Sequence, residues 1–159
     1  MLFFTPATIF WLILASSMAH VVEEYVGGWV KFVRSFDNPI SQISTGVFYV
    51  VNLIFIFLCL LAALLNLSFF VFSLSIVALV FMNALIHLGG TIKFRRYTPG
   101  VATATLFYLP ISLYAYYLYD EAGLLALTNV ALSTLLGVGW MGLAVAFGIV
   151  TSRRARHGK

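Results

Sequence analysis

Residues 5–24 read TPATIFWLILASSMAHVVEE and decide how this chain folds. The stretch from residue 5 to residue 22 contains no Asp, Glu, Lys or Arg, which is typical of a helix that crosses a membrane. It ends in three ionisable side chains, His20, Glu23 and Glu24. A charge in bilayer hydrocarbon costs roughly 2.5 kcal/mol or more, so we expect these side chains to face a protein interior, a ligand or the membrane surface.

The composition of the whole chain indicates an integral membrane protein. Of its 159 residues, 62% are hydrophobic and only 9% are charged, whereas soluble domains carry about 25% charged residues. The single cysteine, Cys59, excludes a disulfide within the chain. Because the basic residues lie at the ends of apolar segments, we expect membrane lipids rather than nucleic acid as partners.

Five apolar segments are long enough to cross a membrane, and they predict one all-α transmembrane domain over residues 1–159. We expect the first segment to end at Gly27-Gly28 and the third at Gly89-Gly90, and we expect Pro110 to kink the fourth. The predicted spans cover residues 5–26, 41–65, 68–88, 101–119 and 124–150.

The nine Lys and Arg residues predict the orientation of these spans. Five crossings place all of them on one side, in the first loop, the third loop and the C-terminal tail, and leave the other side without any. The positive-inside rule then predicts a cytoplasmic C-terminus and an N-terminus outside. The basic residues are Lys31, Arg34, Lys93, Arg95, Arg96, Arg153, Arg154, Arg156 and Lys159.

A second polar cluster ends the third segment. Asn83 and His87 are four residues apart and share a helix face. His20 likewise shares a face with Glu23 and with Glu24. Both clusters lie at the cytoplasmic ends of their segments, so we expect them to meet. Two imidazoles and two carboxylates are ligands for Zn, Fe or Mn, with Asn83 as a fifth ligand or as the group that orients His87.

The same residues leave other roles open. A buried Glu beside a His can act without a metal, as an acid–base pair on a lipid-like substrate. Each side chain also has a structural interpretation. Glu23 and Glu24 can mark the membrane interface, with Lys31 or Arg34 neutralising them. His20 can make an interhelical hydrogen bond, and His87 can be favoured by the helix dipole.

The loop before the fourth segment carries Arg95, Arg96 and Tyr97, followed by a Pro99-Gly100 turn. The arginines can clamp a phosphate or carboxylate headgroup, anchor the chain at the membrane surface, or pair with the glutamates. Tyr97 is either an interfacial aromatic or a hydrogen-bond donor to the site. These three residues are therefore candidates for substrate binding. The candidate catalytic residues are His20, Glu23, Glu24, Asn83 and His87.

Further polar and small residues concern helix packing. Asn52 and Asn129 lie inside segments, and we expect each to make an interhelical hydrogen bond. The fifth segment carries pairs of small residues four apart, which allow close packing within the chain or between copies in a homo-oligomer. These pairs are Ser133 with Gly137 and Gly142 with Ala146.

The chain resembles a family of multi-span membrane proteins named for a His-x-x-Glu-Glu motif. The motif is present at residues 20–24, and the resemblance extends to Asn83-x-x-x-His87 and to residues 95–100 with Thr103. It implies a bacterial membrane protein that is suspected of being an enzyme and has no established activity.

These observations predict a small membrane enzyme with a His/Glu site near the cytoplasmic face, acting on a lipophilic substrate. A metal-activated water would make it a hydrolase, a redox metal an oxidoreductase, and an acid–base pair without a metal an isomerase. The alternative is a non-enzymatic carrier, binding or accessory protein, in which the first and third spans make structural polar contacts.

Overall fold

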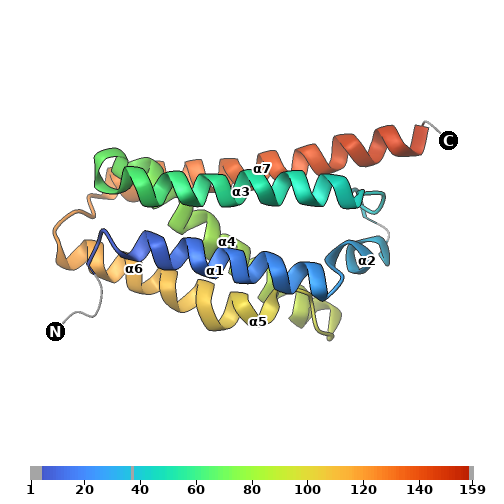
Figure 1. The fold of residues 1–159 in the computed structure, drawn as a ribbon, viewed down its shortest axis with the longest axis horizontal. Helices are drawn as coiled ribbons and strands as arrows, with labels where there is room; N and C mark the ends of the chain where they lie inside the picture. The colour runs from blue at the N-terminus through green and yellow to red at the C-terminus, as the bar shows by residue number, and fades with distance from the viewer. Residues whose placement is uncertain (1–4, 37, 158–159) are drawn as a thin grey trace.

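The computed structural model describes residues 5–36 and 38–157, which fold into helices (Figure 1). No strand occurs among these residues, so the predicted all-α class is confirmed. The α-helices are separated by a 3₁₀ turn, η1, and a π-helical segment, η2. In chain order the elements are α1 (Ile9–Val26), α2 (Trp29–Arg34), α3 (Thr45–Leu65), η1 (Asn66–Phe69), α4 (Phe70–Phe94), α5 (Val101–Thr103), η2 (Ala104–Tyr108), α6 (Leu109–Glu121) and α7 (Leu127–His157).

Four stretches of the described chain are long and apolar enough to cross a membrane. One of them, Thr45–Phe94, holds 50 residues and contains α3 and α4, joined by η1. Asn66 turns the chain there with a φ of 48°, and its Nδ2 donates to the Ala7 carbonyl at 3.1 Å. The structure is therefore consistent with a membrane protein. The number of crossings, their orientation and the extent of the domain stay predictions.

Helix α4 is the centre of the bundle and contacts α1, α3, α6 and α7. Its residues 73–80 are buried without interruption. Helix α7 approaches it closely at Gly137, where a Cβ would lie 2.8 Å from the Ser75 carbonyl oxygen. Trp140 donates from Nε1 to Oγ of Ser75 at 3.3 Å. The Gly137 small-residue position is thus used within the chain, whereas a Cβ at Gly142 would meet open space.

The two glycine pairs behave differently at the helix ends. Helix α1 ends at Val26, immediately before Gly27-Gly28, as predicted. Helix α4 passes through Gly89-Gly90 and ends at Phe94, so the predicted end at residue 88 is wrong. Neither of these two glycines has a positive φ, and both stay helical. The left-handed residue that ends α4 is Arg95, with a φ of 51°.

The fourth predicted span is a helix in three pieces, α5, η2 and α6. The π-helical turn η2 lies immediately before Leu109-Pro110. Proline has no N–H to donate, and its ring collides with the preceding turn of a regular α-helix. A wider turn with i→i+5 hydrogen bonds accommodates it, so the irregularity expected at Pro110 takes the form of a π segment.

The basic regions gather at one end of the bundle (Figure 1). Helix α2, with Lys31 and Arg34, lies at the same end as the last turns of α7, opposite η1 and the α6–α7 connection. Arg96, in the loop after α4, donates to Oγ of Ser35 at 2.7 Å. Helix α7 continues past the predicted end at residue 150 to residue 157. The three regions are therefore together, as predicted, although Lys159 lies outside the described residues.

Candidate functional site

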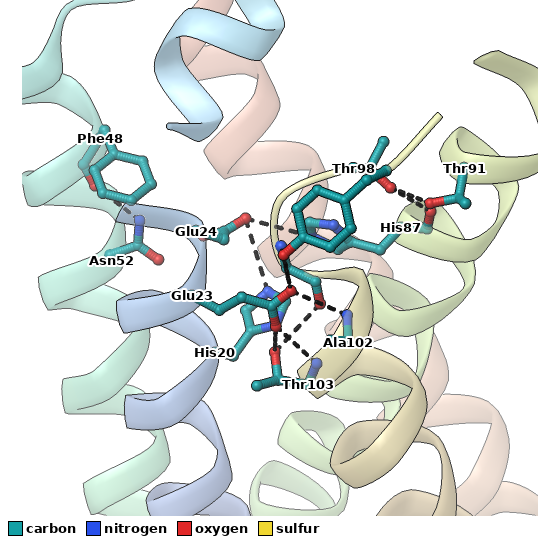
Figure 2. Close-up of polar contacts among 12 residues, drawn as sticks. His20, Glu23, Glu24, Phe48, Asn52, His87, Thr91, Thr98, Ala102 and Thr103 are labelled. Carbon is teal, nitrogen blue, oxygen red and sulfur yellow. Dashed lines mark hydrogen bonds and ion pairs between the residues drawn. The ribbon is translucent and has the colours of Figure 1, made fainter. Parts of the chain in front are cut away.

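Helices α1 and α4 meet at a buried cluster formed by His20, Glu24 and His87 (Figure 2). The exposed fraction is 1% for His20 and 6% for each of the other two residues. Oε1 of Glu24 lies 3.7 Å from Nε2 of His20 and 3.3 Å from Nε2 of His87. The two imidazole rings meet edge to face, with 4.8 Å between centroids. The prediction that the two polar clusters meet is confirmed.

The hydrogen bonds around His20 determine which of its nitrogens faces the cluster. Its Nδ1 lies 2.8 Å from Oγ1 of Thr103. The Thr103 hydroxyl has one proton, which is directed at Oε2 of Glu23 at 2.5 Å and at the Gly100 carbonyl at 3.2 Å. The hydroxyl therefore accepts a hydrogen bond from Nδ1 of His20. In the neutral ring Nε2 is then unprotonated, and it is buried without a hydrogen-bond partner among the described residues.

Glu23 is bound by the loop that precedes α5 and by residues of α5 itself. Its Oε1 accepts from the backbone N–H groups of Gly100 and Ala102 at 3.1 Å and 3.0 Å, and from the Tyr97 hydroxyl at 2.5 Å. Its Oε2 accepts from the backbone N–H of Thr103 at 2.7 Å and from the hydroxyl of the same residue. Both oxygens are satisfied, so the structure does not place Glu23 as the predicted metal ligand. Instead the carboxylate satisfies the free N–H groups at the start of the next helix.

Tyr97 lies between two of the stretches that are able to cross a membrane. Partial burial, followed by the hydrogen bond to the Glu23 carboxylate, raises the pKa of Tyr97 to about 12. The hydroxyl therefore stays protonated and remains a donor at physiological pH. Of its two predicted roles, Tyr97 takes that of a donor, and its acceptor is Glu23.

Gly100 lies directly against both imidazole rings. Its φ is 100°, in the left-handed region that favours glycine. A Cβ at this position would come within 2.6 Å of Cε1 of His87 and 2.8 Å of Cε1 of His20. The sequence analysis interpreted this residue only as part of a turn. In the structure, the missing side chain lets the loop backbone pack on the cluster.

Tyr108 also belongs to the site and was not predicted. Its ring is completely buried and lies 4.5 Å from the His20 ring, measured between centroids. Tyr108 follows Thr103 by five residues, a spacing that a regular α-helix turns to another face. The π segment η2 has i→i+5 turns and brings the two residues to the same side. Pro110, which disturbs the helix at this point, is the sequence signal for such a change of register.

Neither arginine of the loop pairs with a glutamate among the described residues. Arg96 is directed at α2 and the residues that follow it, and its guanidinium lies 4.7 Å and 4.4 Å from the ring centres of Phe32 and Phe36. Arg95 forms the exposed left-handed end of α4. Of the three alternatives, pairing with a glutamate is therefore not realised among the described residues, because the loop backbone and hydroxyls satisfy Glu23 instead. Recognition of a headgroup by these arginines stays a prediction.

The two asparagines inside other helices bond locally. Nδ2 of Asn52 donates to the Phe48 carbonyl at 3.0 Å, and Nδ2 of Asn129 donates to the Leu124 carbonyl at 3.3 Å. The predicted interhelical hydrogen bonds are wrong, because each Nδ2 donates to a carbonyl four or five residues earlier in the chain instead. Figure 2 shows the first of these contacts on α3.

A cavity of about 420 Å³ adjoins the cluster and is lined by His20, Glu24 and Asn83. The Oδ1 atom of Asn83 is buried and has no hydrogen-bond partner among the described residues. Asn83 thus lies on the cavity wall, and its Oδ1 does not hydrogen-bond to His87 as the predicted orienting contact required. Most of the remaining lining is apolar and comes from α3 and α7, including Leu58 and Phe147.

A family model described as a protein of unknown function with an HXXEE motif matches residues 11–115. The chain belongs to the HXXEE family. The resemblance inferred from residues 20–24, 83–87 and 95–103 is therefore confirmed. No curated protein and no solved structure matches the chain. In this HXXEE protein the first and last motif residues face the buried cluster, and the middle glutamate holds the loop.

The donor set of this HXXEE protein fits a metal ion. One donor atom from each of His20, Glu24 and His87 lies within 4.8 Å of the others. Ligands about 2.0–2.2 Å from a tetrahedral Zn²⁺ lie about 3.3–3.6 Å from one another. The distances from Glu24 to the two imidazoles, 3.7 Å and 3.3 Å, are close to that range. Two histidines and one carboxylate are also the protein ligands of several catalytic zinc and non-haem iron sites.

Proposed function

We propose that this protein is a small integral membrane enzyme whose site, His20, Glu24 and His87, holds a divalent transition metal and acts on a lipophilic substrate. The site lies near the cytoplasmic face of a multi-pass protein of the bacterial inner membrane. The chain crosses that membrane five times, with α3 and α4 as separate crossings. Zn, Fe and Mn are the metals that suit this ligand set.

The observation that supports the proposal most strongly is the state of His20 Nε2. This nitrogen is unprotonated by the hydrogen-bond argument, buried, and without a partner among the described residues. A buried polar atom without a partner is unfavourable, by about 1–3 kcal/mol. A metal ion shared with Glu24 and His87 would satisfy it.

Each residue around the cluster has its own role in this proposal. His20, Glu24 and His87 would hold the metal, which when bound would supply a Lewis acid for hydrolysis or a redox centre. Thr103 holds the proton of His20 on Nδ1 and so keeps Nε2 free for the ligand position. Tyr108 covers one face of the His20 ring and excludes water from it. The adjoining apolar cavity would receive the substrate.

A non-enzymatic carrier or binding protein is the second candidate, and the same cavity favours it. In that case Glu24 and His87 form a structural pair at 3.3 Å. The cavity would then bind a lipophilic molecule without converting it. Metal content separates the two candidates.

The test is elemental analysis of detergent-purified protein after incubation with Zn²⁺, Mn²⁺ or Fe²⁺. We expect about one metal per chain in the wild type and almost none in His20→Ala, Glu24→Gln and His87→Ala. His157→Ala, which changes the third histidine of the chain, is the matched control and should keep the metal. Folded wild-type protein that binds none of the three metals would overturn the metalloenzyme.

A further inference from the structure

The cavity beside the cluster reaches the outside of the bundle between α3 and α7. Its exposed lining residues are Ile54 on α3, 54% exposed, and Leu143 and Phe147 on α7, 64% and 44% exposed. These residues are apolar, and in a bilayer they face acyl chains. A molecule dissolved in the membrane can therefore enter sideways, without passing through water.

The inner part of the cavity offers two polar atoms that have no protein partner among the described residues. They are Nε2 of His20 and Oδ1 of Asn83, both buried and both on lining residues. When the metal of the proposed function takes the first atom, Asn83 remains as a hydrogen-bond acceptor. An acceptor in an apolar cavity favours a ligand that carries an O–H or N–H group at one end.

The side chains of the lining provide no cation for an anionic ligand. Among the fourteen lining residues the only ionisable ones are His20 and Glu24, and none is Lys or Arg. Arg96, which a phosphate or carboxylate headgroup would need, is held against Phe32 and Ser35 instead. Unless the metal of the proposed function is bound, an anion placed in the cavity would therefore meet the Glu24 carboxylate without a compensating cation.

We infer that the substrate is a lipophilic molecule with a terminal hydroxyl or N–H group, and that it enters the cavity laterally between α3 and α7. Its polar end hydrogen-bonds to Asn83 and lies beside the His20/Glu24 cluster, and its apolar end extends past Phe147 towards the lipid. This inference rests on the proposed function for the role of the cluster, but the cavity can be tested without any reaction.

The experiment is photo-crosslinking of the full-length protein in nanodiscs with a long-chain fatty alcohol that carries a diazirine in its chain. Peptide mapping should place the label on α3 and α7 residues that line the cavity. Ala144→Trp, which fills the cavity, should abolish this label. Ala131→Trp, the same change at an exposed position of the same helix, should not. Asn83→Leu should weaken labelling about tenfold, the effect of one buried hydrogen bond.

The headgroup preference is tested with the matched fatty acid and the methyl ether of the same chain. In the metal-free protein we expect the alcohol to compete for labelling and the other two to compete at least about tenfold less well. Equal competition by the methyl ether would overturn the inference, as would a label that Ala144→Trp leaves unchanged. Metal binding without cavity labelling rejects this inference and leaves the proposed function standing. Cavity labelling without metal does the reverse.

Discussion

The hydroxyl of Thr103 connects the two halves of the His-x-x-Glu-Glu motif. It donates its proton to Glu23 and accepts a hydrogen bond from Nδ1 of His20. The accepting state of the Glu23 carboxylate therefore sets the tautomer of His20. A histidine that binds a metal through one nitrogen usually donates from the other, which orients the ring. Glu23 therefore influences the cluster although neither of its oxygens is directed at it.

Thr103→Val should weaken metal binding about 10–100-fold, because the isosteric side chain cannot hold the His20 proton on Nδ1. Competition with a chromophoric chelator measures this loss. Thr103→Ser keeps the hydroxyl and should stay close to the wild type. In the metal-free protein, nitrogen-15 NMR of labelled histidine reports the tautomer of His20 directly. The tautomer should become mixed in Thr103→Val and stay single in the wild type and in Thr103→Ser. Identical spectra for wild type and Thr103→Val would contradict the role of the hydroxyl.

At this scale the sequence predicted His20, Glu24 and His87, because helical spacing and position near helix ends locate them. It also predicted Tyr97 as one of two alternatives. It could not show which glutamate the loop would bind, since Glu23 and Glu24, three and four residues after His20, each share a helix face with that histidine. The contacts of Gly100 and Thr103 come from a segment about eighty residues away, and no local pattern reports them.

Helix α7 depends on one glycine for its contact with α4. The Cβ position of Gly137 is 2.8 Å from the Ser75 carbonyl oxygen and 2.9 Å from the backbone N of Leu79. Both neighbours are backbone atoms of a buried helix and cannot move aside independently. Helix α7 also supplies much of the cavity wall.

Gly137→Ala should lower the free energy of unfolding by about 1–3 kcal/mol, because the added methyl group forces the two helices apart. Unfolding in SDS mixed micelles, followed by tryptophan fluorescence, measures the change. Gly139→Ala is the matched control, since a Cβ there meets nothing within 4 Å. The control should be neutral or slightly stabilising, because alanine is the better helix former. Equal stability of the two variants would show that the α4–α7 contact is looser than described.

Of the two glycine pairs that were predicted to end a helix, only the pair with a glycine in the left-handed region does so. Gly28 has a φ of 73° and ends α1, whereas Gly89 and Gly90 keep negative φ inside α4. Within an apolar segment a glycine pair costs some helix stability without ending the helix. The sequence does not distinguish the two cases, because the tertiary contacts around each pair decide between them.

Across the whole molecule the basic residues separate from the acidic connection that carries Asp120 and Glu121. The acidic end and the basic end are on opposite sides of the bundle (Figure 1). This separation was predicted from five segments and nine charges, without any contact between helices. Which end faces the cytoplasm depends on the membrane and the insertion machinery, and it stays a prediction.

Cysteine labelling in intact cells tests that orientation. In a Cys59→Ser background, Ala122→Cys at the α6–α7 connection should react with a membrane-impermeant maleimide added outside. Arg154→Cys near the end of α7 should react only after the cells are opened. Both introduced cysteines lie at exposed positions. The native Cys59 is 1% exposed, and its replacement leaves the introduced thiol as the one that can react with the maleimide. The reverse pattern of labelling would place the cluster near the outer face.

The loop that completes the site also sets the timing of its assembly. Glu23 finds its partner Thr103 only after eighty more residues have been made. At about 5–20 residues per second, the ribosome needs about 4–16 s for that length. For most of this interval the nascent first helix carries a histidine and two carboxylates without their eventual partners. In biosynthesis, the motif that names the family is among the first parts made and among the last to become a site.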